Sequence, residues 1–100
     1  GILKVLESGE IGETYNLGGN NEIRNIDLIH RIIELINKIN NGSRENLDQM
    51  RNLITYVEDR LGHDKRYAIN STKAELIGWS KKDSFEINLE KTIKWYMNEV

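Results

Sequence analysis

The chain has no cysteine and no proline among its 100 residues. The lack of cysteine excludes disulfides and thiolate metal sites, and it is typical of a reducing compartment. The formal net charge is only −2, which argues against broad binding to nucleic-acid phosphates. No apolar run approaches the roughly 20 residues that a membrane helix needs. We therefore expect a cytoplasmic protein that binds neither nucleic acid nor a membrane.

The length and the first residues bound the domain organisation. One hundred residues, 38% of them apolar, are enough for one small domain spanning residues 1–100. Residues 1–8 have apolar positions at helical spacing, and Gly9 is predicted to end that helix. This start lacks the long apolar core of a secretory signal and looks like a helix entered part-way along. We therefore expect the chain to be a piece of a longer protein.

Two further helices are predicted from apolar residues that recur at the 3.6-residue period. Asn25 is predicted to cap a helix that runs to about Ile39. His30 falls on its charged face and is expected to be solvated, not a ligand or base. Ser84 is predicted to cap the last helix, whose docking face contains Phe85, Leu89, Ile93, Tyr96 and Val100.

The remaining segments predict a short helix and three short strands. A capping box of Thr72 and Glu75 favours a helix over residues 73–77, ended by Gly78. Residues 40–52 have no clean period and are predicted to be a loop with at most one helical turn. Strands are predicted over residues 13–17, 53–57 and 66–69.

These elements together predict a mixed α/β fold. We expect a small sheet of about three short strands packed with three to four helices. The first two strands are separated by a long helix and a loop, so the sheet is expected to be at least partly parallel. Ligands bind beyond the carboxyl ends of parallel strands. This arrangement would place Asn16 on the same side as the loop of residues 59–63.

The loop after the second strand concentrates cationic side chains around a glycine. The Arg60 guanidinium matches two phosphate oxygens at once, and Gly62 permits a turn that other residues resist. The alternative is a surface loop of Asp–Arg pairs, each worth about 0–1 kcal/mol. The Asn16 amide suits a hydroxyl, carbonyl or phosphate, or alternatively satisfies the backbone of the turn that follows it.

The amino-acid sequences of these segments resemble those of dTDP-glucose 4,6-dehydratases, which are extended short-chain dehydrogenases/reductases. The similarity begins with Gly-Glu-Thr-Tyr-Asn-Leu-Gly-Gly at residues 12–19, and it includes Asp-Arg-Leu-Gly-His-Asp-Lys-Arg-Tyr-Ala-Ile-Asn at residues 59–70. It continues in order through residues 72–73, 78–79, 84–86 and 91–96, and so covers nearly the whole chain. The family has proline where this chain has Leu61. The resemblance implies a nucleotide-sugar site formed by Asn16, Asp59, Arg60, Leu61, Gly62 and His63.

The resemblance also implies a function for a longer parent protein. Such an enzyme uses NAD to convert dTDP-glucose to dTDP-4-keto-6-deoxyglucose, a precursor of deoxysugars such as rhamnose. The chain would be its C-terminal substrate-binding region. The sequence has no Gly-rich dinucleotide motif, no tyrosine followed four residues later by lysine and no identifiable acid–base pair. We therefore expect no catalytic residue here, no NAD bound by the chain alone, and a Rossmann domain on absent N-terminal polypeptide.

Two other functions are open at this stage. The parent is alternatively another nucleotide-sugar enzyme, such as an epimerase or decarboxylase. The chain is alternatively a free-standing interaction module with no enzymatic parent, whose first helix docks a protein partner. A homodimer is one option for the assembly of an enzymatic parent. No metal site is expected, because His30 and His63 are far apart in the sequence and show no ligand spacing.

Overall fold

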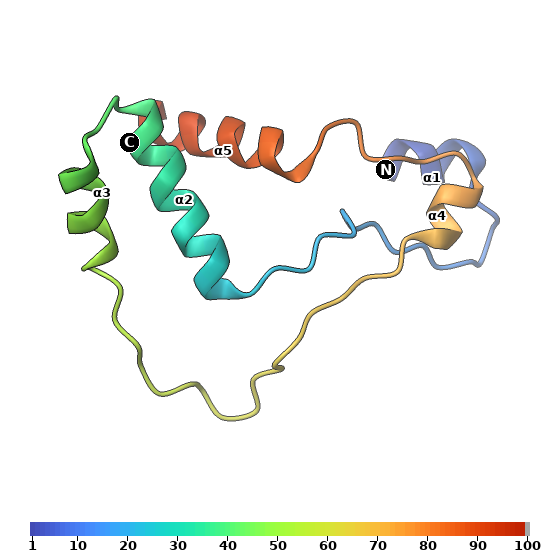
Figure 1. Ribbon diagram of the computed structural model, residues 1–100. Coiled ribbons are helices and arrows are strands. Elements are labelled where there is room, and N and C mark those ends of the chain that lie inside the picture. The colour runs from blue at the N-terminus through green and yellow to red at the C-terminus, as the bar shows by residue number, and fades with distance from the viewer. Residues whose placement is uncertain (100) are drawn as a thin grey trace. The chain divides into compact units, whose positions relative to one another are not determined.

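The computed structural model describes residues 1–99, and within that range it contains helices joined by extended segments (Figure 1). The chain divides into two compact units. Unit 1 comprises Gly1–Glu22 and Lys65–Phe85, and unit 2 comprises Ile23–Asp64 and the last helix from Glu86 onward. The helices are α1 (Ile2–Ser8), α2 (Asn25–Ile39), α3 (Arg44–Arg51), α4 (Thr72–Leu76) and α5 (Phe85–Glu99).

The predicted sheet is wrong, because no residue between 1 and 99 lies in a β-strand. The segments predicted as strands, residues 13–17, 53–57 and 66–69, are irregular extended chain. A strand forms only where a second backbone completes its ladder of hydrogen bonds. Residues 13–17 and 66–69 share unit 1, yet no ladder joins them. Residues 53–57 follow α3 directly, and Tyr56 and Val57 are exposed. The apolar residues in these segments therefore do not form strands, and the prediction of a mixed α/β fold is wrong.

Helix α2 has the predicted apolar stripe, but its N-cap differs from the predicted one. The N-cap is Arg24, whose carbonyl accepts the Leu28 N–H at 3.0 Å, so Asn25 is already helical. Arg24 also donates to Asp27 at 2.6 Å, in the first turn where the helix dipole favours a negative charge. Leu35, on the apolar stripe, is 3% exposed and forms part of the core of unit 2.

Helix α3 lies where the sequence predicted a loop, and it packs beside α2 (Figure 1). Its capping box has asparagine at the third position in place of the usual Glu or Gln. The Ser43 hydroxyl accepts the Asn46 backbone N–H at 3.2 Å, and the Asn46 side-chain oxygen Oδ1 accepts the Ser43 backbone N–H at 3.1 Å. Arg51 donates to Glu34 of α2 at 3.2 Å. The cap and this ion pair stabilise a helix that has little apolar periodicity of its own.

Helix α4 forms close to its predicted place, but its N-cap is Ser71, which makes no side-chain cap hydrogen bond. Thr72 is the first helical residue, and its hydroxyl donates to the Asn70 side chain at 2.6 Å. The predicted Thr72–Glu75 capping box is therefore wrong. Gly78 has φ +93°, and the next N–H, of Trp79, reaches back to the Ala74 carbonyl at 3.1 Å. This confirms Gly78 as the helix end, because only glycine adopts that φ at little cost.

Helix α5 begins at Phe85, directly after the predicted cap Ser84. Ile93 is buried and Leu89 is half-buried, as the predicted docking face requires. Tyr96 is exposed and packs edge-on against Trp95 instead. Val100, the last member of the predicted face, lies outside the described residues.

Unit 1 is built around a buried hydroxyl. Ser71 is 1% exposed, accepts the Gly18 N–H at 2.8 Å and donates to the Gly18 carbonyl at 3.0 Å. A Cβ on Gly18 would lie 2.9 Å from Ile69, so the close approach of the two segments requires glycine. Helix α1 begins this unit and leaves Ile2 and Leu6 exposed. Among the helices described, none combines the length and the apolar character needed to cross a bilayer.

Candidate functional site

The cationic loop of residues 59–63 folds into a tight turn within unit 2. The His63 N–H points to the Arg60 carbonyl at 3.4 Å, and Gly62 has φ +72°. A positive φ at the third of four turn residues is typical of a type II turn. Nothing lies within 4 Å of a Cβ built on Gly62, so backbone conformation rather than space favours glycine there. The prediction that Gly62 permits a turn is confirmed.

Asp59 and His63 form the main polar contact of this turn. His63 Nδ1 lies 2.9 Å from Asp59 Oδ1 and 3.2 Å from Oδ2. The Arg60 N–H also donates to Oδ1 at 2.8 Å. The hydrogen bond from His63, with a smaller contribution from the Arg60 N–H, holds the pKa of Asp59 below its usual value. One carboxylate therefore ties the imidazole to the backbone that begins the turn.

Arg60 is exposed, and within residues 1–98, whose side chains the structure describes, no acidic side chain forms an ion pair with its guanidinium. The alternative prediction, a surface loop of Asp–Arg ion pairs, is therefore not what the structure shows at Asp59. The Asp59 carboxylate contacts the Arg60 backbone and the His63 ring instead. Arg66 behaves differently, since it donates to both Glu22 oxygens at 3.1 and 2.5 Å, which raises its pKa. Leu61, between Arg60 and Gly62, is 100% exposed.

Asn16 lies in unit 1, in extended chain between the half-buried side chains of Tyr15 and Leu17. Its own side chain is exposed. The structure therefore gathers Asp59, Arg60, Gly62 and His63 in one turn of unit 2, and describes Asn16 separately in unit 1.

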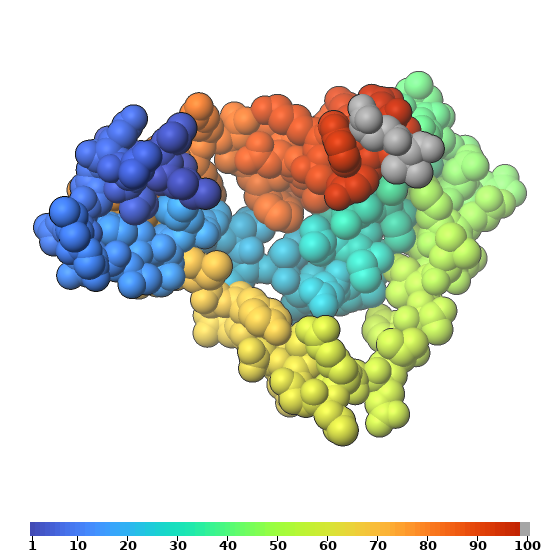
Figure 2. Space-filling model, turned by 180° about the vertical axis from the view of Figure 1, so that it is seen from behind, coloured from blue at the N-terminus to red at the C-terminus, as the bar shows by residue number. Residues whose placement is uncertain are grey.

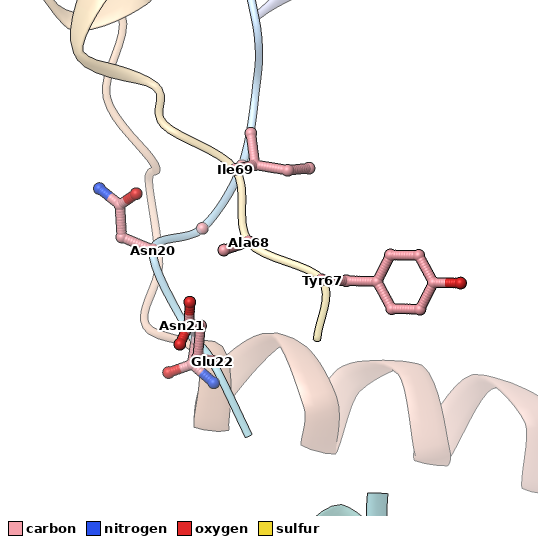
Figure 3. A pocket seen from close by; sticks show the side chains of 8 residues that line it. Asn20, Asn21, Glu22, Tyr67, Ala68 and Ile69 are labelled. Carbon is pink, nitrogen blue, oxygen red and sulfur yellow. The ribbon is translucent and has the colours of Figure 1, made fainter. Parts of the chain in front are cut away.

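Sequence reasoning missed a hollow in unit 1, of about 480 Å³. Two segments form it, and Figure 3 shows Asn20–Glu22 on one and Tyr67–Ile69 on the other. Polar links surround it: Lys81 donates to the Gly19 carbonyl at 2.9 Å, and the Asn20 amide donates to Glu75 at 3.3 Å. The one sequence signal was the Gly-Gly-Asn-Asn run at residues 18–21, which predicted only a turn.

Also in unit 1, Lys73 contacts two side chains of the segment between α1 and α2, those of Glu13 and Tyr15. Its ammonium pairs with Glu13 and lies 5.3 Å from the centroid of the Tyr15 ring. The hydrogen bond to Glu13 raises the Lys73 pKa. Exposed pairs of this kind contribute about 0–1 kcal/mol, so they join the two segments of unit 1 without forming a reactive centre.

The described residues do not fit a dinucleotide or a metal ion. Dinucleotide sites place a Gly-rich turn between a strand and a helix N-terminus. Gly18 and Gly19 instead lead through a bend at Asn20, with φ +50°, into irregular chain as far as Arg24, and no strand precedes them among the described residues. Within the same range, no three His, Asp or Glu side chains gather as metal ligands would.

Comparison with known proteins identifies the relatives of the chain. No protein-family model matches it. It is 43% identical over 94 residues to a probable dTDP-glucose 4,6-dehydratase of Sinorhizobium fredii. It is 42% identical over 98 residues to dTDP-glucose 4,6-dehydratase 1 of Escherichia coli K12, and 38% over 98 residues to the Neisseria meningitidis serogroup B enzyme.

The resemblance to dTDP-glucose 4,6-dehydratases is confirmed. These three alignments cover 93–97% of this chain but only 26–28% of each relative. The chain thus spans about a quarter of the length of the dehydratases it matches. Each alignment runs through nearly the whole of this chain.

Proposed function

We propose that the chain is the C-terminal, substrate-binding part of an NAD-dependent dTDP-glucose 4,6-dehydratase. The parent enzyme converts dTDP-glucose to dTDP-4-keto-6-deoxyglucose with the loss of one water, and this part grips the nucleotide. The observation that carries the proposal is the match of nearly the whole chain to enzymes of that name. The turn of residues 59–63 supports it with chemistry suited to a nucleoside diphosphate.

Arg60 is the residue proposed to bind the diphosphate. Its guanidinium offers a planar fork that donates two parallel hydrogen bonds to phosphate oxygens. The carboxylate of Asp59 next to it is occupied by His63 and by a backbone N–H. It therefore forms no ion pair with the Arg60 guanidinium. Gly62 keeps the backbone compact beside the guanidinium, and His63 supplies a polar ring edge for the nucleoside.

The division of labour follows from what the described residues contain. Without a dinucleotide-binding turn, this part contributes orientation and selectivity, and the cofactor is held by other polypeptide of the parent. Holding a substrate against a reactive group contributes several kcal/mol to catalysis in general. We therefore expect the 100-residue chain alone to bind the nucleotide but not to turn over dTDP-glucose.

The proposal is tested by Arg60→Ala in the longer protein that contains this chain. Loss of hydrogen bonds to a charged group is expected to weaken dTDP binding by about 1.5–3 kcal/mol, measured by calorimetry. Arg44→Ala is the matched control, because it removes another exposed arginine, at the start of α3. Equal affinities of the Arg60 variant and the unchanged protein would remove Arg60 from the site.

A panel of nucleotide sugars distinguishes the dehydratase from other nucleotide-sugar enzymes. The longer protein is expected to consume dTDP-glucose and release the 4-keto-6-deoxy product, followed by the absorbance of the keto sugar. Turnover of UDP-sugars without turnover of dTDP-glucose would instead support an epimerase or decarboxylase.

A further inference from the structure

The contact between Asp59 and His63 assigns a role that the resemblance does not. We propose that Asp59 is a positioning residue that holds the His63 imidazole with its proton on Nδ1, and so fixes the ring within the turn that is proposed to bind the nucleotide. The nucleotide half of this inference rests on the proposed function. Asp59 then acts through His63 rather than by touching the ligand, which is consistent with a carboxylate placed in a site for an anionic diphosphate.

The chemistry of the carboxylate decides the tautomer. An ionised carboxylate has acceptor sites only, so a nitrogen at hydrogen-bond distance from it must donate. His63 Nδ1 is within that distance of both Asp59 oxygens, at 2.9 and 3.2 Å. The lowered pKa of Asp59 keeps the group ionised at neutral pH. The neutral ring therefore carries its proton on Nδ1 and its lone pair on Nε2.

This tautomer restricts what the ring can do. In neutral His63, Nε2 accepts a hydrogen bond; in the protonated ring, Nε2–H donates one. Nδ1–H faces Asp59 in both states, so Nε2 is the only ring atom whose hydrogen-bonding role changes. A ring that donated from Nε2 while neutral would require Asp59 to donate to Nδ1, which an ionised carboxylate cannot do.

Burial and backbone contacts make the arrangement more than an exposed pair. The His63 side chain is 21% exposed, whereas that of Asp59 is 71% exposed. Asp59 Oδ1 also accepts the Arg60 N–H, and the Arg60 carbonyl faces the His63 N–H that closes the turn. The carboxylate thus fixes the ring relative to the backbone that carries the guanidinium. Its loss is expected to loosen both proposed ligand-binding side chains.

The test measures the ¹⁵N chemical shifts of the imidazole nitrogens in the 100-residue chain, at a pH where an ordinary imidazole is neutral. In the unchanged chain His63 is expected to show a protonated Nδ1 and an unprotonated Nε2. Asp59→Ala is expected to abolish that preference, and Asp59→Asn, which keeps an acceptor oxygen, to retain part of it. Asp64→Ala is the matched control, and His30 is the reference ring in the same spectrum. A neutral His63 protonated on Nε2 in the unchanged chain would overturn the proposal.

The same variants are then titrated with dTDP. Asp59→Ala is expected to bind about tenfold more weakly, the effect of losing one charge-assisted hydrogen bond, while Asp64→Ala binds unchanged. Normal dTDP affinity in Asp59→Ala, despite a changed tautomer, would overturn the role in nucleotide binding. A protonated Nδ1 in a chain that does not bind dTDP at all would support the positioning of His63 and count against the proposed function instead.

Discussion

The two units of the chain are stabilised in different ways. Unit 2 is stabilised by helices whose apolar faces follow from the periodic spacing of apolar residues in the sequence, and Leu35 and Ile93 are buried there. An ion pair also joins Arg31 of α2 to Glu86 of α5 at 2.6 Å. Unit 1 has short helices and joins segments distant in sequence through polar groups, above all Ser71 and Gly18, which are 53 positions apart. Local periodicity therefore accounts for α2 and α5 of unit 2, but not for the link between Ser71 and Gly18 in unit 1.

The largest effect is expected from the apolar core of unit 2. Leu35→Ala removes the most buried large side chain among those described, and should lower the free energy of unfolding by about 2–5 kcal/mol. Leu53→Ala, at a leucine that is 80% exposed, is the control and should change it by less than about 0.5 kcal/mol. Urea unfolding followed by circular dichroism measures both. Equal effects would show that α2 is not packed as described.

A smaller effect is expected from the polar link of unit 1. Ser71→Ala removes one acceptor and one donor from the Gly18 backbone in a buried place, and should cost about 1–3 kcal/mol. The loss should appear first as faster hydrogen exchange of the Gly18 amide. The exposed Ser80 provides the control, Ser80→Ala. An unchanged Gly18 exchange rate would break the contrast between the units.

These contrasts explain how much was predictable. The helices at residues 1–8 and 25–39 and the start of α5 followed from the spacing of their apolar residues, because that signal is local. Helix α3 was missed because its capping box uses Asn46, and the predicted strands failed because a ladder depends on a distant partner. In the loop, the turn at Gly62 was predictable from one glycine. The Asp59–His63 contact was not, since the residue types alone equally favoured Asp–Arg pairs.

The loop of residues 59–63 sharpens the comparison, because it belongs to unit 2 but has no helix. In the family, proline stands at the position of Leu61, the second residue of the turn, where proline is favoured. Leu61→Pro should therefore stiffen the loop and strengthen dTDP binding by about 0.4–1 kcal/mol, through a smaller loss of chain entropy. Calorimetry against the unchanged chain measures the gain. Weaker binding would show that residue 61 does not have the backbone angle of a type II turn.

The smallest expected effect is a dependence of the loop on acid pH. The folded pKa of Asp59 is lowered, so its contribution is fully present above the unfolded value of about 3.9 and is lost as the pH falls through the lower folded value. The carboxyl carbon shift of Asp59, followed by NMR, should therefore titrate below that of an ordinary aspartate. The contact with His63 should persist at neutral pH. Titration of Asp59 at or above the ordinary value would contradict the contact.

The central proposal is that this chain binds the nucleotide of dTDP-glucose through the turn at residues 60–63. The most direct test adds dTDP to the isotope-labelled chain and follows the amide signal of Gly62, with that of Asn16 in unit 1 followed separately. We expect the Gly62 signal to shift and saturate with one dissociation constant, while that of Gly42, in the α2–α3 connection, stays in place. A saturable shift elsewhere that leaves Gly62 unaffected, or no saturable shift at all, would contradict the proposal.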